Sequence, residues 1–261
     1  MRCFLASYLN GGDPVSINAL PRQLRWVDTD DYLHHAIAPW AVRDMSHVDT
    51  LLLRGAVLLH LSVLANQRPA LVKTHHINAV VDGFELIPPQ MTEAAIYVVR
   101  DPRDVAVSLA AYLGKSIDQA IDYMSEDDAL LTRPESDMGK PIHHILSSWS
   151  NHVDSWLKLK RPLCFVRYED LHEGRGFREI VQTMGLELDE VRLRKAVRSS
   201  SFEVLKDQED QGGFIENASS SSFFRGGEVG GWQTKLTPGQ INRIVAEHGP
   251  AMERMGYLPG G

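Results

Sequence analysis

The stretch that decides the fold is Ile96-Tyr97-Val98-Val99-Arg100-Asp101-Pro102-Arg103-Asp104-Val105-Ala106-Val107-Ser108. It begins with an apolar, β-branched run, which is typical of a strand in a parallel sheet that is covered on both faces. Asp101 then provides a helix N-cap, Pro102 suits the first helical position, and Asp104 lies where a capping box has its acceptor. The stretch therefore predicts a strand that leads directly into a helix.

Arg100 lies at this junction, and Ser108 follows two helical turns later. Ligands of open α/β sheets bind beyond the carboxyl ends of the strands, where helix N-termini present unpaired N–H groups to phosphates. The pattern indicates an anion site. The spacing alone fits equally well a surface ion pair at Arg100 and a solvated serine at position 108.

The composition limits the classes of protein to which this chain can belong. The 261 residues suffice for one α/β core, and no linker-like stretch divides them, so we expect a single domain over residues 1–261. Lys and Arg total 27 against 34 Asp and Glu, and the net charge of −7 argues against a nucleic-acid or anionic-membrane surface. Cys3 and Cys164 form no disulfide framework, and no secretory signal or membrane span is visible, so we expect a cytoplasmic protein.

Hydrophobic spacing and capping residues predict the remaining elements. Helices are expected over residues 2–9, 29–37, 48–66, 142–159, 177–184 and 190–197, and strands over residues 70–74, 94–99 and 162–167. Thr237-Pro238-Gly239-Gln240 carries a capping-box pattern that opens the last helix. The pattern predicts an α/β fold, a three-layer domain with a mostly parallel central sheet and helices on both faces.

The segment around Arg100 resembles the 3′-phosphate-binding segment of the PAPS-dependent sulfotransferases, where PAPS is 3′-phosphoadenosine 5′-phosphosulfate. In that family an arginine and a serine eight positions later hold the 3′-phosphate of the nucleotide. Arg100 and Ser108 keep this spacing. The resemblance implies the sulfotransferase fold, which is related to that of nucleotide kinases.

Val72-Lys73-Thr74-His75 resembles the Lys-Thr-His motif of the same family. The resemblance implies that His75 takes the proton of the attacking acceptor and that Lys73 stabilises charge on the transferring group. A histidine after a strand is more often a structural residue, and His76 stays open as the working imidazole.

Three further segments follow in the family's order: Tyr168-Glu169-Asp170, Ser200-Ser201-Phe202 and the glycine-rich stretch 223–232. The first two resemble segments beside the adenine, and the third resembles the family's C-terminal phosphate loop. A glycine-rich loop can bring backbone amides close to a phosphate. The resemblance implies nucleotide contacts by Tyr168, Ser200, Phe202, Phe223, Phe224, Arg225, Gly226 and Gly227.

The chain departs from the family pattern at three places. Gly226 replaces a lysine and Gly231 replaces an aspartate, so Arg100 and Arg225 are the cations left for the phosphate. The family opens with a strand and a Pro-Lys-x-Gly-x-Thr-Trp loop that binds the phosphosulfate, whereas Met1 stands where this loop would end. The resemblance therefore implies that the first strand and this loop are missing, and that the chain as given is a poor catalyst.

The activity that the resemblance implies is sulfuryl transfer from PAPS to a hydroxyl or amine of a small molecule, with 3′-phosphoadenosine 5′-phosphate (PAP) as the product and no metal. The pairs His34-His35, His75-His76 and His143-His144 are not spaced like metal ligands. A catalytically silent nucleotide-binding protein is one alternative, and a small-molecule kinase is another, although no Walker loop is visible. The acceptor would lie among residues 26–40, 76–84 and 113–138. Both a monomer and a homodimer are compatible with the sequence.

Overall fold

The computed structural model describes residues 1–24, 26–39, 46–65, 70–132, 142–215, 222, 224 and 227–259. The chain forms two compact units. Unit 1 comprises Met1–Arg25, Ala94–Ile117 and Leu163–Ile241, and unit 2 comprises Trp26–Glu93, Asp118–Pro162 and Asn242–Gly261. The expected single domain over residues 1–261 stays a prediction.

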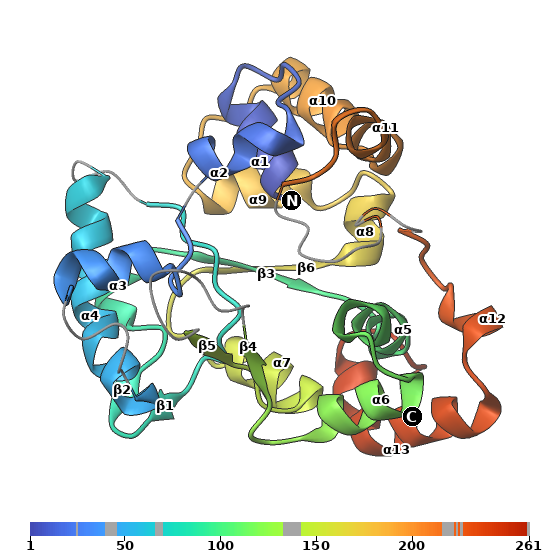
Figure 1. The fold of residues 1–261 in the computed structure, drawn as a ribbon. Coiled ribbons are helices and arrows are strands. Elements are labelled where there is room, and N and C mark those ends of the chain that lie inside the picture. The colour runs from blue at the N-terminus through green and yellow to red at the C-terminus, as the bar shows by residue number, and fades with distance from the viewer. Residues whose placement is uncertain are drawn as a thin grey trace. The chain divides into compact units, whose positions relative to one another are not determined.

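Unit 1 is built on a parallel pair of strands, β3 (Ala95–Val99) and β6 (Leu163–Arg167), which lie side by side in Figure 1. Its helices are α1 (Arg2–Leu9), α2 (Leu20–Gln23), α5 (Pro102–Leu113), α8 (Tyr168–His172), α9 (Phe177–Thr183), α10 (Glu190–Ser199), α11 (Phe202–Gly212) and α12 (Trp232–Lys235), with a 3₁₀ turn at Ile17–Ala19. The α/β class and the central parallel strands are confirmed.

The core of unit 1 lies between these strands and the helices. Helix α9 packs on both strands, and α1 packs on α10. The ring centroids of Phe4 in α1 and Phe177 in α9 lie 4.4 Å apart, and Ile180 of α9 is fully buried. Among the described residues β3 pairs with β6 alone, and of its five residues only Val99 is fully buried. The strand is therefore less enclosed than its apolar sequence predicts.

Unit 2 is mostly helical, with two antiparallel hairpins. Its helices are α3 (Asp31–Ile37), α4 (His47–Leu64), α6 (Ile117–Ser125) and α7 (Trp149–Leu157), with a 3₁₀ turn at Pro89–Met91. The hairpins pair β1 (Val80–Val81) with β2 (Phe84–Glu85), and β4 (Leu130–Thr132) with β5 (His143–Ile145). Helix α13 (Pro238–Arg254) begins in unit 1 and continues into unit 2. Within the described ranges, no helix is long and apolar enough to cross a membrane.

Two predicted elements of unit 2 are wrong in part. The strand expected over residues 70–74 is reduced to one parallel bridge between Lys73 and Val27, because the partner segment turns into α3 at Asp31. The helix expected over residues 142–159 begins only at Trp149, because His143–Ile145 pairs with β4 and Ser147 then turns at a φ of 61°.

Candidate functional site

The parallel register of β3 and β6 brings two predicted site residues together. Val99 pairs with Arg167, so Arg100 and Tyr168 both follow the last residue of a strand at the same sheet edge. The guanidinium carbon of Arg100 lies 4.5 Å from the centroid of the Tyr168 ring. Burial raises the pKa of the Tyr168 phenol, and the charge of Arg100 opposes this effect. The phenol is therefore a neutral donor near pH 7.

The start of α5 is fixed as the sequence predicts, except for one contact. The carboxylate of Asp101 accepts a hydrogen bond from the Arg103 N–H at 2.9 Å and so caps the helix. Asp104 does not complete a capping box, because the Asp101 N–H donates instead to Oε1 of Glu169, at 3.0 Å. Asp101 and Glu169 are both buried, so this bond satisfies a donor that water cannot reach.

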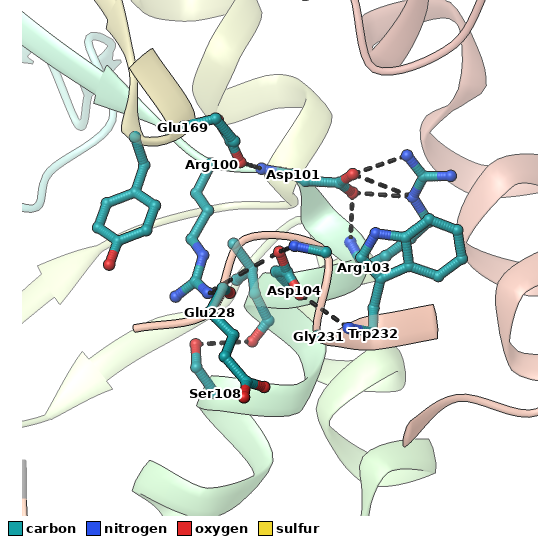
Figure 2. A network of polar contacts seen from close by, with 12 residues as sticks. Arg100, Asp101, Arg103, Asp104, Ser108, Glu169, Glu228, Gly231 and Trp232 are labelled. Atoms are coloured by element: carbon teal, nitrogen blue, oxygen red, sulfur yellow. Dashed lines mark hydrogen bonds and ion pairs between the residues drawn. The ribbon is translucent and has the colours of Figure 1, made fainter. Parts of the chain in front are cut away.

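Asp104 instead holds the turn that follows the glycine-rich stretch. Its two carboxylate oxygens accept hydrogen bonds from the Gly230 N–H, at 2.8 Å, and the Trp232 N–H, at 2.9 Å. Figure 2 shows these bonds from the helix to the turn, with the Trp232 indole beside Arg103. Asp104 is only 3% exposed, so its charge is stabilised by these N–H groups rather than by water.

Arg100 points toward the same turn. Its Nη2 donates to the Glu228 carbonyl at 2.9 Å and lies 3.8 Å from Oδ2 of Asp104. Among the described residues, its buried Nε has no hydrogen-bond partner. Ser108 is exposed, and its hydroxyl donates to the Val105 carbonyl at 3.2 Å (Figure 2). The turn thus orients the guanidinium, and the exposed serine hydroxyl can exchange its local bond for one to a ligand.

Aromatic side chains gather around Gly227. The Tyr168 hydroxyl donates to the Gly227 carbonyl at 3.3 Å, and the rings of Phe202 and Phe224 meet edge to face at 6.1 Å. Gly227 has a φ of 51°, and a Cβ there would lie 2.3 Å from the Phe202 ring. Only glycine fits this position.

The remaining predicted nucleotide residues are placed less favourably. The Ser200 hydroxyl donates to the Ala196 carbonyl at 2.9 Å and is therefore engaged at the end of α10. Phe223, Arg225 and Gly226 lie outside the described residues.

The residues of the Lys-Thr-His motif lie in unit 2, whereas the nucleotide candidates lie in unit 1. Lys73 is held through its backbone, whose N–H donates to the Trp26 carbonyl at 2.9 Å. The His75 carbonyl accepts a hydrogen bond from Nε2 of His152 at 3.1 Å, while His75 itself is exposed. Contact with the surrounding protein, which displaces water from part of the ring, and then the charge of Lys73 lower the pKa of His75. Its imidazole is therefore neutral near pH 7.

His76 has a structural role. It is 2% exposed, and its Nδ1 accepts a hydrogen bond from the Ile145 N–H at 3.0 Å. Its carbonyl accepts a second bond from the Trp156 indole at 3.1 Å. Since the ring is buried and one nitrogen is occupied by the backbone, His75 is the better placed of the two imidazoles.

His76 also belongs to a buried polar cluster with Asp28 and His144, whose ligand-type atoms lie within 4.8 Å of one another. The cluster is already hydrogen-bonded. Asp28 accepts from Nη2 of Arg54 at 2.7 Å, and Nε2 of His144 lies 2.8 Å from the Thr29 hydroxyl. Because Nδ1 of neutral His76 is an acceptor, its Nε2 carries the hydrogen and cannot ligate a metal. The arrangement fits a hydrogen-bond network better than a metal site.

The sequence of Asp104 and Glu169 gave no indication of their partners. The sequence pattern predicts that Asp104 caps its own helix, and it predicts no contact for Glu169. Their partners lie 126 and 68 positions away, at Gly230 and Asp101. Each is an acid beside an arginine or a tyrosine, but the partner of such an acid depends on tertiary structure.

Comparison with known proteins identifies the family. The sequence profile of the sulfotransferase domain matches residues 24–256. The chain belongs to the sulfotransferase family. Human sulfotransferase 1C2 is 29% identical over 189 residues, which cover 67% of this chain and 59% of that protein. Dog sulfotransferase 1B1 is 31% identical over 192 residues, which cover 69% of this chain and 60% of that protein. The chain thus spans less than two thirds of the length of these sulfotransferases.

Solved sulfotransferase structures share the fold. The crystal structure of mouse sulfotransferase SULT7A1 complexed with PAP has a TM-score of 0.52, with 21% identity over 75% of this chain and 73% of that chain. The structure of retinol dehydratase in complex with androsterone and the inactive cofactor PAP has a TM-score of 0.58, with 15% identity over 96% of this chain and 76% of that chain. At these identities the structural likeness establishes the fold alone.

Proposed function

We propose that this protein transfers the sulfuryl group of PAPS to a hydroxyl or amine of a small-molecule acceptor and releases PAP. The observation that carries the proposal is the position of Arg100. It follows the end of β3 at the start of α5, beside the Tyr168 ring, and its buried Nε has no partner among the described residues. Membership of the sulfotransferase family and the PAP named in related structures support the same ligand.

In this proposal Arg100 and Ser108 hold the 3′-phosphate. A guanidinium at the positive end of a helix provides both charge and directed donors for a phosphate. Tyr168, Phe202 and Phe224 provide aromatic surface for the adenine, and Gly227 leaves the space that the Phe202 ring occupies. Ser200, Phe223, Arg225 and Gly226 complete the proposed nucleotide contacts.

His75 is the proposed base. The acceptor oxygen or nitrogen forms a bond to sulfur, the bond between sulfur and the 5′-phosphate oxygen breaks, and the acceptor proton passes to the neutral imidazole. PAP leaves with the bonding electron pair. Lys73 is proposed to stabilise the negative charge that develops on the leaving phosphate. These groups require no metal ion.

Calorimetry with PAP tests the nucleotide part of the proposal. The unaltered chain should bind PAP, and Arg100→Ala should lose about 2 kcal/mol or more, roughly a 30-fold weaker affinity, because a charge-assisted contact is removed. Arg194→Ala is the matched control, since Arg194 is an exposed arginine of the same unit, on α10. Equal PAP affinity of the Arg100 and Arg194 variants would contradict the assignment.

Turnover assays separate the alternatives. PAPS-dependent sulfation of a panel of phenols, alcohols and amines supports the enzyme. PAP binding without sulfation of any of them would indicate a silent binding protein. Phosphorylation of the same panel by ATP and magnesium, without PAP binding, would indicate a kinase.

A further inference from the structure

We infer that Asp104 is a positioning residue that fixes the turn 227–232 and, through it, the guanidinium of Arg100. The inference rests on the proposed function, because it assigns α5 and the turn 227–232 a joint role in binding the 3′-phosphate of the nucleotide. It concerns a residue that does not itself touch the ligand.

The charge of Asp104 holds the backbone of the turn 227–232. Both carboxylate oxygens accept backbone N–H bonds, one from Gly230 and one from Trp232. These two amides are therefore unavailable to a phosphate, contrary to the expectation that the glycine-rich stretch presents its amides to the ligand. A buried carboxylate that accepts two such bonds is a strong anchor, because charge-assisted hydrogen bonds are about twice as strong as neutral ones.

The same first turn of α5 also holds the side chain of Trp232, through Arg103. The guanidinium carbon of Arg103 lies 3.9 Å from the indole centroid, and Arg103 is itself held by Asp101 at 2.6 Å. The backbone of Asp101 is itself held in place, because its N–H donates a hydrogen bond to the carboxylate of Glu169. The first turn of α5 thus holds the turn 227–232 in two ways (Figure 2). Asp104 binds its backbone N–H groups, and Arg103 packs on the Trp232 side chain.

The turn 227–232 also contacts Arg100. Nη2 of Arg100 donates to the carbonyl of Glu228, two residues before Gly230. If the turn moved, this carbonyl would move with it, and the guanidinium of Arg100 would lose the hydrogen bond that orients it. The contribution of Asp104 to anion binding therefore passes through Arg100.

The charge of Asp104, taken alone, predicts the opposite effect on PAP binding. Its Oδ2 lies 3.8 Å from Nη2 of Arg100, so its negative charge competes with an anion for this arginine. The two effects have opposite signs. Positioning predicts that loss of the carboxylate weakens PAP binding, whereas competition predicts that it strengthens PAP binding.

The test is calorimetry with PAP on the 261-residue chain and its Asp104→Asn variant. An asparagine has nearly the same shape, but it places an NH₂ donor against one of the two amide donors, so we expect PAP affinity to fall about 10-fold or more. Asp207→Asn is the matched control, because Asp207 is an exposed aspartate of unit 1, on α11. Asp104→Glu keeps the charge but moves it by one methylene, and should have an intermediate affinity.

A double-mutant cycle tests the route through Arg100. In the Arg100→Ala background, Asp104→Asn should change PAP affinity less than about 3-fold, because the group that Asp104 positions is gone. Additive effects in the cycle would contradict the inference, as would equal or tighter PAP binding by Asp104→Asn alone.

Amide hydrogen exchange of residues 227–236 provides a readout that needs no ligand. Exchange should be faster in Asp104→Asn than in Asp207→Asn, since one of the two bonded amides loses its acceptor and faces an NH₂ donor instead. Unchanged exchange would contradict the anchoring role. Failure of the unaltered chain to bind PAP would instead contradict the proposed function, and with it the role of Asp104 in binding, whatever the exchange result.

Discussion

At the scale of single residues, the adjacent imidazoles of His75 and His76 have different tasks. His76 is enclosed and bonded to the β5 backbone, whereas His75 is exposed and, within the described part of the chain, is hydrogen-bonded through its carbonyl. The sequence presents them as equivalent, because both follow the same lysine and threonine. Their environments decide the difference.

We therefore predict opposite results for the two alanine variants. His75→Ala should lower the turnover of an active form about 100-fold or more with little change in melting temperature, because a general base is lost. His76→Ala should mainly lower stability, by about 1 to 3 kcal/mol, because the buried Ile145 N–H loses its acceptor. Steady-state kinetics and thermal unfolding measure the two effects. Loss of turnover in His76→Ala alone would identify the other imidazole as the base.

The candidate site shows how far the sequence could be used at this scale. Arg100 was predicted correctly at the strand end, because the position of a residue after a β-branched run depends on local sequence. The partners of Arg100 could not be predicted, since Glu228 is 128 positions away and is brought close by the fold. Asp104 shows the same limit: its position on the helix is local, but its acceptor role is tertiary.

At the scale of elements, helix starts were predicted best. Asp101 caps α5, and Thr237 and Gln240 form the reciprocal bonds of a capping box at the start of α13, at 3.3 and 3.0 Å. Such signals lie within four residues, so one sequence contains them. The hairpin of β4 and β5 was missed because apolar residues at helical spacing continue through residues 143–145, and only pairing with residues 130–132 makes them a strand.

The capping box of α13 gives a stability prediction. Thr237→Ala should lower the free energy of unfolding by about 1 kcal/mol, because the Gln240 N–H at the helix start loses its side-chain acceptor. Thr237→Ser keeps the hydroxyl and is the control. Urea unfolding followed by circular dichroism measures both. A loss of equal size in the serine variant would show that the methyl group, and not the capping bond, stabilises this end of the helix.

At the scale of the whole molecule, buried histidines are concentrated in one unit. Loss of hydration inside the protein lowers the pKa of His34, His152 and His248, and all three lie in unit 2. These imidazoles stay neutral in the folded chain but take up protons in the unfolded chain once the pH is below 6.5. The unfolded state therefore binds more protons in acid, and stability falls as the pH falls.

We predict that the free energy of unfolding decreases from pH 7.5 to pH 5.5, and that amide protection is lost first in unit 2. Hydrogen exchange of residues 46–65 and 177–199 at the two pH values compares the units. His248→Gln should reduce the pH dependence, because one buried group no longer titrates, whereas His172→Gln, at an exposed position of unit 1, should leave it unchanged. Equal loss of protection in both segments would contradict the assignment to unit 2.

The packing of α1 has a consequence for the order in which the protein acquires its structure during synthesis. Phe4 and Tyr8 are buried only once Phe177 and the Glu187 carbonyl have been made, about 170 residues later, which takes roughly 10 to 40 s at the usual speed of a ribosome. Until then the helix that is translated before the rest of unit 1 keeps its apolar face uncovered. Helix α1 is thus made well before the residues that cover it, and during that interval its apolar face is a surface that a chaperone at the ribosome could bind.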